Sequence, residues 1–181
     1  MKVYVMLADG FEETEALVPW DVLKRAGAEV KLVSVSASKR VTGAHGLAVE
    51  ADAVIDGIGP SIPDCIVLPG GMPGTLNLKA CAKLSAMLLE ADSKGGVIAA
   101  ICAAPSVLGG LGLLKGKKAV CFPGFENTLD GATVVDTAVC RDGRIITAKG
   151  MGAAFEYAFA LTDLFFGNET AAQLKKGVQY N

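Results

Sequence analysis

Short β-rich runs alternate with helical stretches along most of this chain, and that alternation restricts the fold more than any other feature. The predicted strands are Lys2–Leu7, Val30–Val35, Cys65–Leu68, Val97–Ile101, Ala119–Phe122, Val139–Arg141 and Ile145–Lys149. The predicted helices are Glu12–Ala26, Cys81–Ser93, one from Ala103, Met151–Phe166 and Glu169–Val178. Strands that alternate with helices form a largely parallel sheet covered on both faces. We therefore expect one doubly wound, flavodoxin-like α/β domain over residues 1–181, with a hairpin excursion over Val41–Asp52 turning at Gly43–Gly46.

The segment GGVIAAICAAP, which ends at Pro105, predicts a strand that turns sharply into a helix at Cys102. Ala100 and Ala104 are small, as a backbone that passes close to itself requires, and proline is tolerated in the first turn of a helix. This is the pattern of a nucleophile elbow with cysteine as the nucleophile. A thiol at a helix N-terminus would be stabilised as a thiolate. The alternative is a buried, inert cysteine, which is the usual role of this residue type in an apolar strand.

Composition excludes several classes of partner and cofactor. The chain has 17 basic and 19 acidic residues, a net charge of −2 and no Lys/Arg-rich run, so we expect no sequence-specific nucleic-acid binding. The uncharged stretch Gly95–Leu114 holds glycines and a proline, and a buried strand and helix explain it better than a membrane span. No signal-peptide pattern opens the chain, which predicts a soluble, cytoplasmic protein. Five scattered cysteines and a single histidine predict neither a disulfide framework nor a metal site.

The loop after the first predicted strand, Ala8–Glu15, is acidic. Phosphate groups bind where backbone amides are exposed and no anions compete, so flavin or nucleotide binding is disfavoured and we expect no cofactor. Glu12 and Glu13 are expected to complement the dipole of the following helix. Glu15 is instead predicted to face the crevice at the carboxyl edge of the sheet. There it could share a proton with Cys102, donate a hydrogen bond to the thiolate and act as general acid and base.

The motifs LADGFEETEA, VLPGG and AAICAAP, in this order, resemble the ThiJ/PfpI superfamily, in the branch of the human Parkinsonism-linked deglycase and bacterial YajL. The resemblance runs nearly end to end. It implies a flavodoxin-like homodimer with a reactive cysteine at Cys102, its hydrogen-bonded glutamate at Glu15, and oxyanion-binding amides at Gly71 and Ala103. Gly70, in the loop that follows the predicted strand Cys65–Leu68, is expected to bring its amide close to a ligand.

At two positions this chain lacks a histidine that members of the superfamily carry, and this limits the residues that could act as a base. The protease-like members carry histidine directly after the cysteine, where this chain has Ala103. Phe122, in CFPG, replaces the histidine that the human relative carries near the site, and we expect it to line the pocket. A Cys/His peptidase would therefore lack its usual base. Proton transfer would depend on Glu15, and His45 is expected to be a surface or interface residue.

Three functions remain open at this point. The resemblance implies a cofactor-free enzyme acting on reactive dicarbonyls, such as methylglyoxal, or on early glycation adducts (a glyoxalase III or deglycase type). Here Cys102 would add to the aldehyde carbon while Glu15 moves the proton. The second hypothesis is an oxidative-stress sensor that oxidises at Cys102. The third is a holdase chaperone, for which the apolar fraction of 51% would also suit core and dimer burial.

Overall fold

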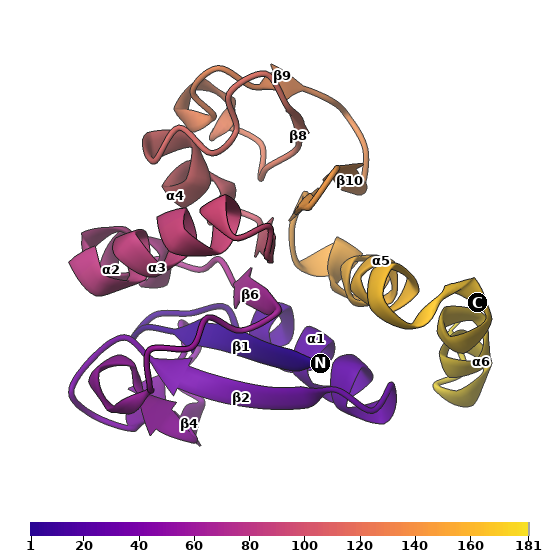
Figure 1. Cartoon of the computed structure of the whole chain (residues 1–181), viewed down its shortest axis with the longest axis horizontal. Coiled ribbons are helices and arrows are strands. Elements are labelled where there is room, and N and C mark those ends of the chain that lie inside the picture. Colours follow the sequence, from indigo (N-terminus) through magenta and orange to yellow (C-terminus); the bar gives the residue numbers. More distant parts are fainter. Residues whose placement is uncertain (181) are drawn as a thin grey trace.

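The computed structural model describes residues 1–180, and within them the main sheet has seven strands in the order β10-β11-β7-β6-β1-β2-β5 (Figure 1). Their bounds are β1 Lys2–Leu7, β2 Glu29–Ser34, β5 Ala53–Val54, β6 Cys65–Leu68, β7 Val97–Ile101, β10 Val139–Asp142 and β11 Ile145–Ala148. All neighbouring pairs are parallel except β10 with β11. Taken in chain order, the five longer parallel strands follow the 2-1-3-4-5 arrangement of flavodoxin-like folds, so the predicted fold class is confirmed.

Helices cover both faces of the sheet because successive side chains of its strands point to opposite sides. On one face, Val3, Val5 and Leu7 pack in the same apolar cluster as residues of α1 and α5. On the other, Tyr4 and Met6 share a cluster with residues of α2, α3 and α4. In Figure 1 the C-terminal helices α5 and α6 lie on the opposite side of the molecule from α2 and α3. The helices are α1 Glu13–Arg25, α2 Gly74–Ala80, α3 Ala82–Ser93, α4 Pro105–Gly110, α5 Ala154–Phe166 and α6 Asn168–Gly177.

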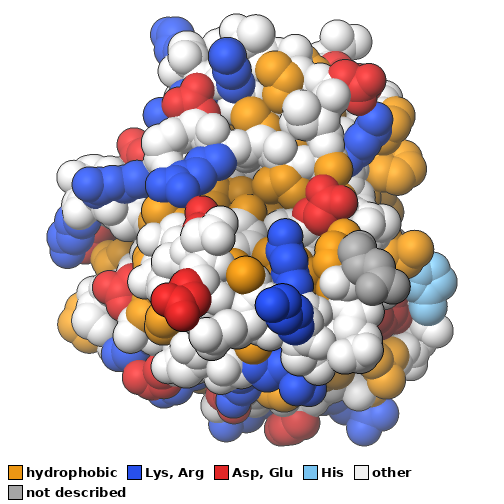
Figure 2. All heavy atoms as spheres, turned by 90° about the vertical axis from the view of Figure 1, so that its right-hand side faces the viewer, with side chains coloured by type: hydrophobic (Ala, Val, Ile, Leu, Met, Phe, Trp, Pro, Cys, Tyr) orange, Lys and Arg blue, Asp and Glu red, His pale blue; other side chains and the backbone are white. Residues whose placement is uncertain are grey.

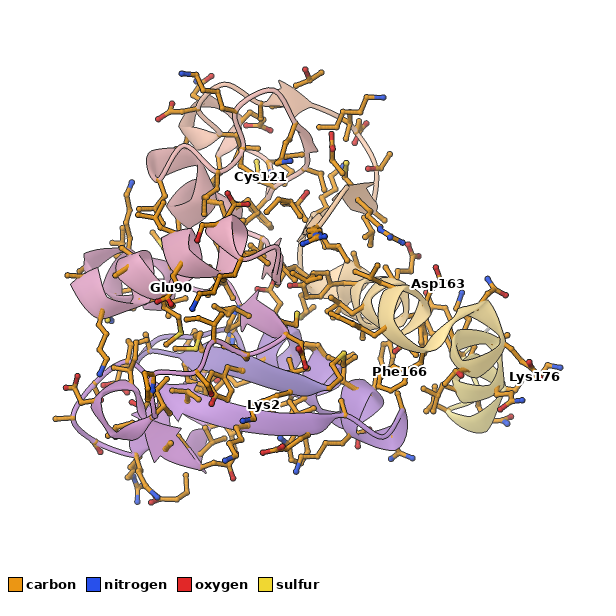
Figure 3. The ribbon with its side chains drawn as sticks, viewed as in Figure 1. Lys2, Glu90, Cys121, Asp163, Phe166 and Lys176 are labelled. Carbon is orange, nitrogen blue, oxygen red and sulfur yellow. The ribbon has the colours of Figure 1, made fainter. Side chains whose placement is uncertain are left out.

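Charged side chains occupy the outer faces of these helices. Glu90 on α3 and Lys176 on α6 are both exposed, and Figure 3 shows Lys176 projecting away at the end of the molecule. Figure 2 shows acidic and basic side chains interspersed over one face. Among residues 1–180, no helix is both long enough and apolar enough to cross a membrane, and the uncharged stretch Gly95–Leu114 contains β7 and the short helix α4.

The predicted hairpin is also present. β3 (Arg40–Thr42) and β4 (Ala48–Glu50) pair in antiparallel fashion and turn through Gly43–Gly46, as expected. The hairpin contacts the loop before α1, because the Gly10 N–H donates to the Thr42 carbonyl oxygen at 2.8 Å and the Ala44 N–H to the Phe11 carbonyl oxygen at 2.8 Å. These bonds hold the loop that leads into the first turn of α1.

One predicted strand is wrong. Of the expected strand Ala119–Phe122, only Ala119 lies in a strand, as the last residue of β8 (Lys118–Ala119), which pairs with β9 (Thr133–Val134) outside the main sheet. The backbone beyond it makes isolated bonds instead of a ladder: the Val120 N–H donates to Thr147 Oγ1 at 2.9 Å, and Pro123 has no N–H to donate.

The helix predictions need smaller changes. Helix α2 was not predicted, and the segment expected as Met151–Phe166 begins with a 3-10 turn, η3 (Met151–Ala153), before α5. Two further 3-10 turns, η1 (Ile55–Gly57) and η2 (Glu126–Thr128), lie in loops.

Candidate active site

Cys102 lies at a sharp turn directly after β7. Its φ of 65° falls in the left-handed region, which residues other than glycine seldom adopt and which is common at strained functional positions. The Cys102 N–H donates to the Ala148 carbonyl oxygen at 2.9 Å, and its own carbonyl oxygen accepts from the Phe122 N–H at 2.8 Å. Ala104 is fully buried, and Pro105 begins α4. The elbow geometry predicted from GGVIAAICAAP is therefore present.

Glu15 reaches the same place from the first turn of α1. Glu12 caps this helix, and its Oε2 accepts the Glu15 N–H at 2.7 Å. The Glu15 side chain is buried, with an exposure of 1%, and its Oε2 accepts the Gly70 N–H at 2.8 Å. The Cys102 thiol neighbours the same carboxyl group closely enough for each to shift the pKa of the other, and Glu15 Oε1 is buried without a hydrogen-bond partner among residues 1–180. The structure thus brings together the carboxyl and the thiol that the sequence placed at two separate strand ends.

The loop after β6 fits closely between these two groups. A Cβ at Gly70 would lie 2.7 Å from Cys102 Cβ and 2.7 Å from Glu15 Oε2, so no side chain fits at this position. Gly71 has a φ of +87°, and its amide and that of Ala103 point at the Cys102 sulfur. These two are the amides expected to bind an oxyanion. Gly70 differs from the expectation, because its N–H is donated to Glu15 rather than left for a ligand.

Burial controls the protonation of this pair. Desolvation raises the pKa of Glu15 to about 7, although the Gly70 N–H and the Cys102 thiol lower it in part. Desolvation and then the charge of Glu15 raise the pKa of Cys102 to about 12, against the smaller opposing effect of the Ala103 and Gly71 amides. Both shifts favour the uncharged forms, and a charge on either group disfavours a charge on the other, so the pair holds at least one proton near neutral pH. The resting thiolate stays a prediction.

The short helix α4 contributes little to stabilising a thiolate at Cys102. It starts at Pro105, beyond Cys102, and spans only 6 residues, so its dipole acts weakly on the sulfur. The largest effect on the pKa of Cys102 is therefore the loss of solvation, which raises it. Burial thus moves the pKa of Glu15 close to neutral pH.

His45 does not belong to this pair. Its side chain is 76% exposed, its ring Nδ1 lies 2.8 Å from Glu13 Oε2, and its backbone N–H donates to Glu13 Oε1 at 2.8 Å. Glu13 raises the pKa of His45. Glu12, Glu13 and His45 are the group of potential metal ligands found among residues 1–180, with ligand atoms within 4.8 Å of one another. Their carboxylates already serve as the cap of α1 and as the partner of His45.

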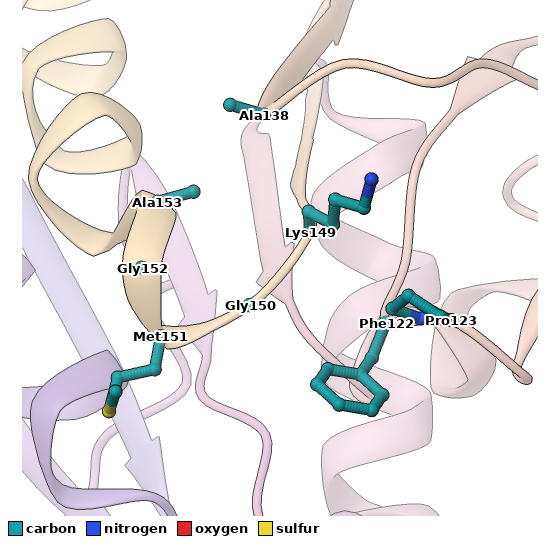
Figure 4. Close-up of a pocket in the computed structure, with 8 residues that line it drawn as sticks. All are labelled: Phe122, Pro123, Ala138, Lys149, Gly150, Met151, Gly152 and Ala153. Atoms are coloured by element: carbon teal, nitrogen blue, oxygen red, sulfur yellow. The ribbon is translucent and has the colours of Figure 1, made fainter.

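A pocket of about 460 Å³ lies beside the elbow (Figure 4). It is lined by Phe122, Pro123, Ala138, Lys149, Gly150, Met151, Gly152 and Ala153. Phe122 lines it as expected. The wall formed by Lys149–Ala153 was missed by the sequence analysis, although the glycines of the motif AKGMG directly after a predicted strand are a signal of close backbone approach.

Known proteins resemble this chain over nearly its whole length. Residues 1–164 match the DJ-1/PfpI family. Protein DJ-1 homolog B of Arabidopsis thaliana is 41% identical over 175 residues, which cover 96% of this chain and 40% of the relative, so the chain spans less than half of that protein. Deglycase PH1704 of Pyrococcus horikoshii is 34% identical over 154 residues, covering 82% of this chain and 90% of the relative.

A solved structure also resembles this chain in both fold and sequence. The structure named "Toxoplasma gondii DJ-1, oxidized" has a TM-score of 0.95 and 38% identity, and the match covers 99% of this chain and 98% of that one. The family match, the relatives and the elbow geometry lead to the same assignment. This chain belongs to the DJ-1/PfpI family.

Proposed function

We propose that this protein is a cofactor-free enzyme that converts reactive α-oxoaldehydes, free or as early glycation adducts, into 2-hydroxy acids. One observation carries the proposal: a buried carboxyl with a pKa of about 7 faces a thiol at a strained elbow, with two amides pointing at the same sulfur. The name of the Pyrococcus relative, a deglycase, supports chemistry on glycated molecules.

The reaction begins at the aldehyde carbon of the substrate. Cys102 Sγ adds to this carbon while ionised Glu15 takes the thiol proton. Glu15 then passes that proton to the resulting oxyanion, which gives a hemithioacetal and leaves Glu15 ionised again. The amides of Gly71 and Ala103 stabilise the developing oxyanion. Because Glu15 has a pKa near neutral pH, it suits both uptake and release of this proton.

The second step moves a hydrogen between the two carbons. Glu15 removes the proton from the former aldehyde carbon, giving an enediolate, and returns a proton to the neighbouring carbon. The first carbon is thereby oxidised to a thioester and the second reduced to an alcohol, so no external oxidant is needed. Water then cleaves the thioester, which releases the 2-hydroxy acid and restores the thiol.

Methylglyoxal tests this proposal through formation of lactate. We expect the purified protein to form lactate, measured by NMR, at a kcat/KM that rises with pH through an apparent pKa of about 7, because the ionised form of Glu15 is the base. Heat-denatured protein at the same concentration controls for reactions of exposed thiols. Lactate formation no faster than in this control, or a rate that falls as Glu15 ionises, would contradict the proposal.

Oxidation of Cys102 is a second candidate function, favoured by the same surroundings of the sulfur. The relative from Toxoplasma gondii was solved in an oxidised form. In this chain Cys65, Cys121 and Cys140 are buried, whereas Cys81 and Cys102 are partly exposed. Of these two cysteines, Cys102 is the one that faces a carboxyl group and two amides, which are able to hold sulfinate oxygens.

We therefore expect mild peroxide to oxidise Cys102 before Cys81, because Glu15 accepts the thiol proton as the sulfur attacks the peroxide. Peptide mass spectrometry across a peroxide series measures the order of oxygen uptake. Cys81 is the internal control, because it is also partly exposed. Equal oxidation of the two thiols would argue against a sensor.

A further inference from the structure

Backbone hydrogen bonds connect Cys102 to both walls of the pocket beside the elbow. Phe122, on one wall, donates its N–H to the Cys102 carbonyl oxygen at 2.8 Å. Ala148, which precedes the other wall, accepts the Cys102 N–H at 2.9 Å. The amide of Met151, on that second wall, faces Glu15. The pocket therefore adjoins the reacting pair through the Met151 amide and the backbone of Cys102, although neither Cys102 nor Glu15 is part of its lining.

The pocket lining is apolar. Phe122 and Met151 are 47% and 55% exposed, and Figure 4 shows them on opposite sides of Gly150. Lys149 is the one charged residue of the lining, and its Nζ is already paired with Asp136 Oδ1 at 2.7 Å. Apart from this paired ammonium, the lining offers an uncharged surface with an exposed aromatic ring.

The size of the pocket exceeds what a three-carbon substrate needs. A volume of about 460 Å³ lies within the range of cavities that enclose drug-sized ligands. The methyl group of methylglyoxal would leave most of it empty. Phe122 rests on Gly150, since a Cβ there would lie 3.2 Å from Phe122 Cδ2, and a glycine at this position lets the ring lie against the backbone.

We propose that this pocket binds the substituent on the ketone carbon of the substrate, and that the preferred substituent is an aromatic ring packed against Phe122. The proposal rests on the proposed function and names its substrate class, the arylglyoxals. Phe122 is then a specificity-determining residue, because aromatic rings gain from offset or edge-to-face packing as well as from burial. The reaction stays balanced: phenylglyoxal and water give mandelate, with one carbon oxidised and its neighbour reduced.

The test compares phenylglyoxal with methylglyoxal as substrates of the full-length protein. Product is measured as mandelate and lactate by chromatography, because phenylglyoxal also modifies arginine and its disappearance is not a measure of turnover. We expect kcat/KM to be about tenfold or more higher for phenylglyoxal, the discrimination that apolar pockets typically reach. We expect Phe122→Ala to lower this ratio by about tenfold.

A second variant fills the pocket. A Cβ at Gly152 would meet nothing within 4 Å, so Gly152→Leu places its side chain in open space and should also lower the ratio. Leu89→Ala is the matched control, since Leu89 is 46% exposed on α3 and is not part of the pocket lining, and it should leave the ratio unchanged.

The outcomes separate this proposal from the proposed function. Lactate formation with no preference for phenylglyoxal, or with a ratio that neither pocket variant changes, overturns the aromatic subsite alone. Formation of neither acid overturns the proposed function. If a second copy of the chain covers the pocket, the two variants change the sedimentation coefficient and leave the ratio unchanged, which also overturns the subsite.

Discussion

Replacement of Cys102 by serine is expected to lower kcat/KM for methylglyoxal by about three orders of magnitude or more. A serine hydroxyl is a far weaker acid than a thiol, so its deprotonation by Glu15, which has a pKa of about 7, is much less favourable during attack. The hydroxyl is close in size to the thiol, and the substitution keeps the strained turn at φ 65°. The loss is measured as the initial rate of lactate formation.

The matched control for this variant is Cys81→Ser, which removes the other partly exposed thiol and should retain wild-type rates. Thermal unfolding of both variants checks that neither has lost its fold. A Cys102→Ser protein that keeps more than a tenth of the wild-type rate would show that the sulfur is not the nucleophile.

Glu15→Gln is expected to lower kcat/KM by about 10²- to 10⁴-fold and at the same time to stabilise the protein at alkaline pH. The loss of activity follows because glutamine cannot take up the thiol proton. The gain in stability follows from burial, which raises the pKa of Glu15 from 4.5 to about 7. Between these two values the folded state holds a proton that the unfolded state has released.

Wild-type stability therefore falls as pH rises through this window, and the full cost is present above about pH 7. The shift corresponds to roughly 3 kcal/mol, since one pKa unit corresponds to about 1.4 kcal/mol. A neutral glutamine does not carry this cost. We expect the Tm of Glu15→Gln to exceed that of wild type by several degrees at pH 8 and by little at pH 5. Calorimetry across pH measures it, and a Tm difference that stays constant from pH 5 to pH 8 would contradict the assigned titration.

Much of the fold could be predicted because its strands are buried on both faces. β1, β6 and β7 begin and end at the predicted residues, since each is a short apolar run and such runs mark strands of a parallel sheet. Cys102 was found because the small residues around it are required by the backbone of the turn. Helix α2 was missed because it is short and begins with Gly74, so its pattern over 7 residues is weak.

The protonation of the site could not be predicted from the sequence. Desolvation of Cys102 and Glu15 depends on how completely the fold encloses them, and it opposes the effect of the local dipole that the motif indicates. The partner of the Gly70 N–H is 55 residues away in the chain, so a loop motif cannot show that this amide is already used. The pocket combines Phe122 with the segment after β11, which only the folded sheet brings together.

The close fit at Gly70 also determines where this protein can be altered. A methyl group there would overlap with the nucleophile and the base together, so the spacing of the two reacting groups cannot be adjusted by changing this loop residue. Gly152, in contrast, has room around it. Engineering or evolutionary divergence of this scaffold should therefore leave the reacting pair fixed and proceed by reshaping the cavity next to it.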